Sequence, residues 1–469
     1  MTTKSHFRDC KEWMDEGLGM STTSNEAVKL YDHALHQLMS HTPDLETGGI
    51  MGAIEKMLCA DAEFAMGKVL KAGFQCMSAG SRLDPKVKEI GKDMNRMVHE
   101  NSTLNDREKL HCAAIIEWTN ENVANACKKW EEILFAYPCD TLALSFSYLG
   151  YLTTGKSAML RDSVGRILNQ WNDKDPWYGY ILNRYAFGLE ETNLFDQAER
   201  VTKEGLGLIP NDSWGIHTNA HIYESTCQFS KGVDFLCRTA PDWSVNNTLA
   251  CHNYWHLGLY YIEKAEYENA LTLYDDHIAP AFKKSGIAFN LNDGCQLLQR
   301  FEFEGVDVGD RWDDLYATYK PCNMQHMSCY NDSHMLLSFL KSKIAKNDGK
   351  SKDDFLTSVK EYVNNSAGDN NRLTREVGLG LFDAFIAFTE ERYSDAVELL
   401  FPLKHEFIRL GGSHAQRDMY DQFLLNACIR SSVRKHHEIG RGLIHERKLL
   451  KPVSPLTDRM LEKLVSAHF

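Results

Sequence analysis

Two histidine pairs, each separated by three residues, are the strongest chemical signal in this sequence. The first is His217 and His221, followed by Glu224, in WGIHTNAHIYE, and the second is His252 and His256, in ACHNYWH. On a helix, side chains at i and i+4 share one face, with Cβ atoms about 5–6 Å apart. Two imidazoles at this spacing can bind one metal ion such as zinc, although a catalytic zinc also needs a third protein ligand and an open position.

Three interpretations of these four histidines remain open. The imidazoles can line a groove and bind an organic or peptide ligand by hydrogen bonds, or they can serve metal or acid–base chemistry near neutral pH. They can also be satisfied core or surface histidines, because a chain with 19 histidines can contain such pairs by chance. The metalloprotease HExxH motif is excluded, since Thr218 stands where its glutamate would be.

A third polar cluster is YNDSHMLL, which carries Asp332 and His334. The stretch predicts the start of a helix, and an aspartate at that point can cap the free N–H groups of the first turn. The functional alternative is that Asp332 orients His334 toward a ligand groove.

Arg417 follows Gly411 and Gly412, a pair of glycines that allows a tight turn into a helix. A ligand carboxylate can be bound there by the forked guanidinium of Arg417. The plainer interpretation is a surface ion pair or cap formed by Arg417 and the neighbouring Asp418.

The elements that must position these residues are predicted to be helices throughout. Apolar residues recur at spacings of three and four, and the alternation typical of strands is rare. Units of about 34 residues match the tetratricopeptide pattern, with a small residue in each helix of a pair and a proline after the second. Ala186, Ala198 and Pro210 show this pattern most clearly. We therefore predict an all-α fold: an α-solenoid of tetratricopeptide-like helix-turn-helix repeats with atypical capping helices.

The phase of these repeats places the histidines on adjoining helices. His217, His221 and Glu224 lie on the stripe of a first helix that faces the concave groove in tetratricopeptide proteins, and His252 and His256 lie on the first helix of the next unit. We therefore predict a concave groove lined by histidines, carboxylates and aromatic residues.

Four segments are predicted along the chain. Residues 1–105 form atypical helical repeats, and residues 106–280 form tetratricopeptide-like repeats. Residues 281–330 form an irregular helical connector, and residues 331–469 form C-terminal helical repeats and a cap.

The chain resembles the tetratricopeptide repeat protein 38 family over essentially its whole length, and five stretches carry the resemblance. The resemblance implies an α-helical repeat protein and no settled reaction. Its Gly-Gly-Ser-Asn stretch has His414 here in place of the asparagine, which weakens an essential role for that imidazole. The stretches that carry the resemblance are STTSNEA (21–27), LRDSV (160–164), ACHNYW (250–255), EGVDVGDRW (304–312) and GGSHAQRD (411–418).

Composition excludes several classes of function. A net charge of −13 argues against nucleic-acid binding, which needs a basic footprint. We also expect no membrane insertion, because no apolar run approaches the roughly 18 residues of a membrane helix. The 13 cysteines are scattered and include no CxxC pair, which predicts free thiols. The charged N-terminus predicts a cytoplasmic protein. The basic stretch 430–451 is predicted to be a solvated terminal helix or a docking surface for an acidic partner.

Two functions therefore remain open from the sequence. In the first, the groove binds a small molecule or a short peptide, and any reaction is unidentified. Zinc is the candidate metal at the four groove histidines. The residues predicted to bind the ligand are His217, His221, Glu224, His252, His256, Asp332, His334 and Arg417. In the second, the chain is a protein–protein interaction scaffold without catalytic activity.

Overall fold

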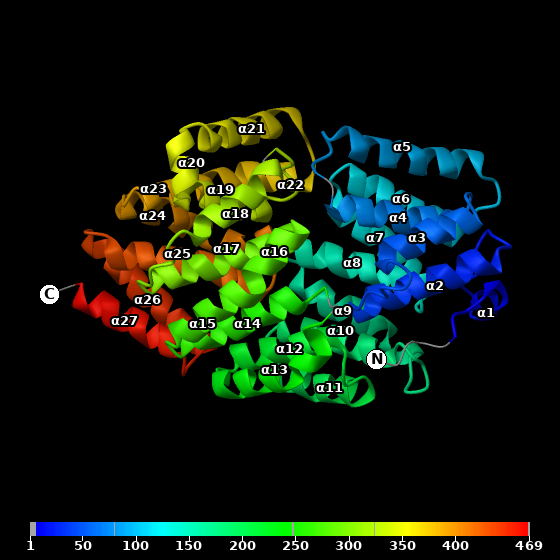
Figure 1. Cartoon of the computed structure of the whole chain (residues 1–469), viewed down its shortest axis with the longest axis horizontal. Coiled ribbons are helices and arrows are strands. Elements are labelled where there is room, and N and C mark those ends of the chain that lie inside the picture. Colours follow the sequence, from blue (N-terminus) through cyan, green and yellow to red (C-terminus); the bar gives the residue numbers. More distant parts are fainter. Residues whose placement is uncertain (1–5, 79, 246–247, 323, 468–469) are drawn as a thin grey trace. The chain divides into compact units, whose positions relative to one another are not determined.

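A computed structural model describes residues 6–78, 80–245, 248–322 and 324–467. These residues form helices joined by turns and loops, with no strand among them (Figure 1), which confirms the predicted all-α class. The chain divides into two compact units, and the boundary lies within one helix. Unit 1 comprises the described residues up to 216 and those of the stretch 245–249, and unit 2 comprises residues 217–244 and those from 250 onward.

Unit 1 consists of consecutive helices that pack mainly against their neighbours in the chain. Its α-helices are α1 (Cys10–Asp15), α2 (Asn25–Ser40), α3 (Gly49–Ala60), α4 (Ala65–Ser78), α5 (Pro85–Glu100), α6 (Asp106–Thr119), α7 (Val123–Ala136), α8 (Thr141–Thr153), α9 (Ser157–Ile167), α10 (Tyr178–Glu190) and α11 (Phe195–Leu208).

A repeated turn explains why these helices form pairs. Asn193, between α10 and α11, has a φ of 62°, and the next backbone N–H, of Leu194, bonds the carbonyl of Leu189 at 2.9 Å. This is a Schellman-type ending, which satisfies carbonyl groups left free at a helix C-terminus. The same left-handed conformation recurs at Glu121, Gly155, Cys227, Ala265 and Glu391, at the end of the first helix of a pair each time.

Small residues bring the helices of unit 1 close together. Ala186 of α10 and Ala198 of α11 are fully buried, as the repeat pattern predicted. Gly188 of α10 approaches the preceding helix, α9, very closely, since a Cβ added there would lie 2.4 Å from the backbone nitrogen of Arg161. Such packing needs residues with little or no side chain, which is the physical basis of the tetratricopeptide pattern.

Unit 2 has the same construction and carries the histidines. Its first helix, α12 (Ser213–Ser225), begins in unit 1 and ends in unit 2. It is followed by α13 (Phe229–Trp243), α14 (Ala250–Glu263), α15 (Tyr267–Leu273), α16 (Ala279–Ser285), α17 (Ala288–Phe303), α18 (Arg311–Tyr319), α19 (Cys329–Lys341), α20 (Lys343–Asp348), α21 (Ser351–Asn365), α22 (Asp369–Leu373), α23 (Leu379–Thr389), α24 (Tyr393–Leu400), α25 (His414–Arg430), α26 (Arg434–Leu450) and α27 (Pro455–Ser466).

Two further sequence predictions can be compared with the structure. All thirteen cysteines are free thiols, as predicted. The stretch 281–330, predicted to be an irregular helical connector, contains the sixteen-residue helix α17 and the shorter α18. Within the part of the chain that the structure describes, no helix has both the length and the apolar character needed to cross a bilayer.

Candidate metal and ligand site

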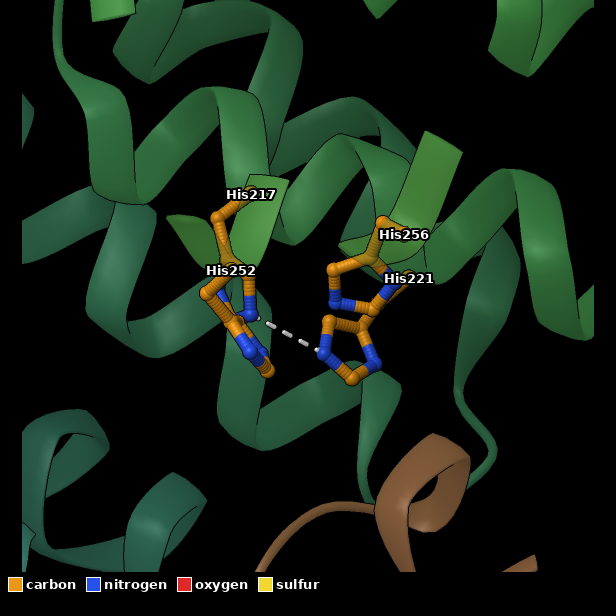
Figure 2. A group of neighbouring side chains, drawn as sticks. All are labelled: His217, His221, His252 and His256. Carbon is orange, nitrogen blue, oxygen red and sulfur yellow. Dashed lines mark hydrogen bonds between the residues drawn. The ribbon is translucent and has the colours of Figure 1, made fainter. Parts of the chain in front are cut away.

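Two neighbouring helices of unit 2 bring the four histidines together. His217 and His221 lie one turn apart on α12, and His252 and His256 lie one turn apart on α14. Figure 2 shows the four imidazoles converging on one point, with the hydrogen bond between His217 Nε2 and His221 Nε2 at 3.1 Å. The repeat phase therefore predicted this grouping correctly, together with the neighbouring Glu224.

The imidazole rings are close enough to share one ligand. The ring centroids are 4.4 Å apart for His221 and His256, 4.6 Å for His217 and His221, and 4.9 Å for His252 and His256. His217 lies 5.0 Å from His252 and 5.1 Å from His256. One nitrogen from each ring lies within 4.8 Å of those of all the others.

All four imidazoles are buried, with exposed fractions between 0% and 3%. Neither ring nitrogen of His256 has a hydrogen-bond partner in the described part of the chain. Burial, and after it the charges of the neighbouring histidines, hold the pKa of His256 well below its usual value. His256 is therefore neutral at physiological pH, which is the form that binds metal ions.

A buried carboxylate fixes the orientation of one of these rings. Asp293 of α17 is fully buried, and its two oxygens lie 2.9 Å and 3.0 Å from His252 Nδ1. Burial raises the pKa of Asp293, and the charge and hydrogen bond of His252 act against this rise. Because Nδ1 donates to the carboxylate, Nε2 of His252 carries the lone pair that a ligand can use.

A second carboxylate, Glu224, links the histidines to the C-terminal part of unit 2. Its Oε2 lies 3.8 Å from His256 Nδ1, and its Oε1 accepts a hydrogen bond of 2.6 Å from Lys451 Nζ. Burial lowers the pKa of Lys451, but the charges of Glu224 and Asp418 together outweigh it and the net shift is upward. Lys451 follows α26, so the end of the basic stretch 430–451 is bound to the site and is not simply a solvated face.

Aromatic rings surround His252. Trp255 stacks on it at 4.9 Å with an interplanar angle of 11°, and Phe289 lies 4.7 Å away. Asp293, Lys451, Trp255 and Phe289 were not among the residues predicted for the site. Trp255 could have been found, since it lies three residues after His252 in the same helix, whereas Asp293 and Lys451 reach the site only through tertiary packing.

The prediction for Asp332 is wrong in both of its forms. The cap of α19 is Ser328, whose hydroxyl accepts from the Asn331 N–H at 3.1 Å. Asp332 lies a turn inside the helix, and it bonds Nδ1 of His326 at 3.0 Å. It does not orient His334, because residues two apart on a helix point in different directions.

His334 is held by its own helix. Its Nδ1 donates to the carbonyl of Tyr330 at 2.7 Å, and its Nε2 has no hydrogen-bond partner among the described residues. Burial, more than any neighbour, lowers the pKa of His334 to about 4.

The predicted pairing of Arg417 with Asp418 is also wrong. Arg417 is buried and donates to the carbonyl of Gly412 and, at 3.4 Å, to His414 Nδ1. Asp418 instead forms a two-oxygen ion pair with Arg447 of α26. Adjacent residues on a helix diverge by about 100°, so the carboxylate meets a cation from another helix.

Comparison with known proteins adds little to this description. No family model matches the chain. Among solved structures, the APC/C hetero-tetramer Cut9–Hcn1 matches at a TM-score of 0.35 and 10% identity, covering 89% of this chain and 75% of that chain. Yeast Tom70 matches at a TM-score of 0.33 and 13% identity, covering 94% of this chain and 88% of that chain. These superpositions are weak. The chain's own helix pairs and repeated turns define it as a tetratricopeptide-like helical-repeat protein.

Proposed function

We propose that this helical-repeat protein binds one divalent transition-metal ion, zinc fitting best, and that the metal site receives a small-molecule ligand. The observation that carries the proposal is the set of four buried imidazoles, from α12 and α14, with one nitrogen each within 4.8 Å of the others. Zinc in proteins is usually tetrahedral, with Zn–N bonds of about 2.0–2.1 Å, so its nitrogen ligands lie about 3.4 Å apart. Small side-chain movements would bring the four nitrogens to this spacing.

The chemistry of the donors selects the kind of ion. Neutral imidazole suits zinc, copper, iron and nickel, whereas magnesium and calcium prefer oxygen ligands. A thiolate does not compete, because burial raises the pKa of the neighbouring Cys251 well above its usual value. Asp293, bonded to His252, supplies negative charge to offset that of the ion.

Burial favours a small ligand over a peptide. A groove that binds an extended peptide keeps its side chains accessible, whereas these imidazoles are at most 3% exposed. The hydrogen bond from Lys451 to Glu224 also ties the C-terminal segment of unit 2 to the site. A scaffold without a ligand site is the weaker alternative, because it leaves the buried, unbonded nitrogens of His256 without a role.

We also propose that the chain belongs to the tetratricopeptide repeat protein 38 family and acts in the cytoplasm. Five stretches, among them ACHNYW at 250–255, support the family assignment, and this stretch contains His252. Thirteen free thiols suit a reducing compartment.

Titration of the metal-free protein with zinc tests this proposal. We expect one tightly bound equivalent, measured by competition with a chromophoric chelator, and no comparable binding of magnesium. The absence of tight zinc, copper, nickel or iron(II) binding would overturn the proposal.

Replacing Asp293 with Asn is expected to weaken zinc binding about 10- to 100-fold, because a carboxylate that bonds a ligating histidine orients it and raises its basicity. Asp332→Asn is the matched control, since Asp332 is also buried and also bonds a histidine Nδ1. Equal zinc affinities for the two variants would show that Asp293 does not position a metal ligand.

A further inference from the structure

Arg300 of α17 is a buried cation without a bonded anion. Its side chain is 2% exposed, and its hydrogen bonds go to neutral acceptors: the Gln296 carbonyl at 3.3 Å, Gln296 Oε1 at 2.9 Å and the Ala415 carbonyl at 2.7 Å. No carboxylate of the described residues lies within ion-pair distance of the guanidinium. Burying a charge is costly unless the charge is paired, so this arginine lacks the partner that usually accompanies such burial.

The nearest acidic groups are already engaged with other residues. Burial lowers the pKa of Arg300, and the charges of Asp418 and Glu224 act against that fall. Yet Asp418 is paired with Arg447, and Glu224 with Lys451. Arginine remains protonated in proteins, so the Arg300 guanidinium carries a positive charge that no bonded anion neutralises.

Unit 1 contains an instructive counterpart, Arg184 of α10. It too is buried and donates to two carbonyls, those of Tyr180 and Met39. The acid that acts on it, Asp212, is bonded to Asn183 and to a backbone N–H and to no other cation. Asp212 is thus available as a counter-charge for Arg184, whereas the acids that act on Arg300 are paired with other cations.

Arg300 lies beside the four histidines. Its Cζ is 5.5 Å from the ring centre of Trp255, and that ring is 4.9 Å from His252 and 4.8 Å from His256. The positive charge of Arg300 also adds to burial in lowering the pKa values of His256 and His334. The unbonded nitrogens of His256 and His334 therefore lie in the field of the same guanidinium.

We propose that Arg300 binds the carboxylate of a small anionic molecule whose other end adds, as a fifth ligand, to the metal ion held by the four histidines. The inference rests on the proposed metal site and names the class of ligand that the site receives. The existing hydrogen bonds of Arg300 use Nη1 and one N–H of Nη2. The remaining N–H groups, on Nε and Nη2, form the side edge of the guanidinium fork, which matches a carboxylate in two parallel hydrogen bonds. A single guanidinium balances a carboxylate, whereas a phosphate carries a larger charge.

The test uses cobalt(II) as a coloured substitute for zinc in the full-length protein, with malonate, succinate and inorganic phosphate as probes. We expect malonate or succinate, each of which has a second carboxylate for the metal, to change the visible spectrum of the cobalt-loaded protein and to raise its melting temperature. Arg300→Gln should weaken this binding about 10- to 100-fold, as expected for lost charge-assisted hydrogen bonds. Arg184→Gln, the matched control, should leave it unchanged.

The outcomes separate the two proposals. A protein that binds neither zinc nor cobalt overturns the metal site itself, and this inference with it. A protein that binds cobalt and neither carboxylate overturns only the inference, as does equal carboxylate binding by wild type and Arg300→Gln. Binding of phosphate alone would contradict the carboxylate assignment. If Arg300→Gln fails to fold, carboxylate binding by the cobalt-loaded wild-type protein still tests the inference.

Discussion

Replacing His217 and His252 together with glutamine is expected to reduce zinc affinity at least about 1,000-fold. The two residues lie on different helices, so the change removes one imidazole from each of α12 and α14. Structural zinc sites bind with about 10–16 kcal/mol in total, and the loss of two of four ligands removes a large part of that. Glutamine keeps the side chains close to their original size and limits the cavity that alanine would leave at buried positions.

His405 and His445 provide the matched control, because both are exposed histidines of unit 2. Their double glutamine variant should bind zinc as the wild type does, in the same chelator competition. Retention of wild-type affinity by the His217 and His252 variant would show that zinc binds elsewhere.

Replacing Asp418 with asparagine is expected to lower the free energy of unfolding by about 3–5 kcal/mol, because it leaves the buried Arg447 guanidinium without its anion. The side chains of Arg447 and Asp418 are only 9% and 14% exposed. Urea unfolding measures the change. Asp275→Asn is the control, since its ion pair with Arg311 is more exposed and should contribute about 0–1 kcal/mol.

The same ion pair predicts the direction of a pH effect. Burial raises the pKa of Asp418, but the charge and hydrogen bond of Arg447 together with the charge of Lys451 outweigh it, and the net pKa is well below the usual value. The contribution of Asp418 is therefore fully present above the unfolded pKa of about 3.9 and is lost as the pH falls below it. A wild-type protein that loses no more stability in acid than Asp418→Asn would contradict this account of the pair.

Much of the fold and half of the site could be predicted from local patterns. Spacings of three and four residues establish helices, and the small residues at Ala186 and Ala198 set the phase of the pairs. That phase placed His217 and His252 on adjoining helices, because each repeat presents the same stripe of its first helix.

The remaining parts of the site depend on contacts that no local pattern encodes. Asp293 of α17 is hydrogen-bonded to His252 of α14. Lys451, which follows α26, is hydrogen-bonded to Glu224 of α12. Asp418 pairs with Arg447 and not with its neighbour in sequence, because helix geometry turns adjacent side chains apart. The sequence also gives no measure of exposure, and the four histidines predicted to line a concave groove are buried.

X-ray absorption at the zinc edge of the zinc-loaded protein tests the central claim most directly. The account predicts a single shell of four nitrogen ligands at about 2.0–2.1 Å, with the multiple scattering typical of imidazole rings. In the His217 and His252 glutamine variant this imidazole signal should be weaker, because only His221 and His256 remain as imidazole ligands. A shell containing sulfur at about 2.3 Å, or oxygen ligands without imidazole scattering, would contradict the four-histidine site.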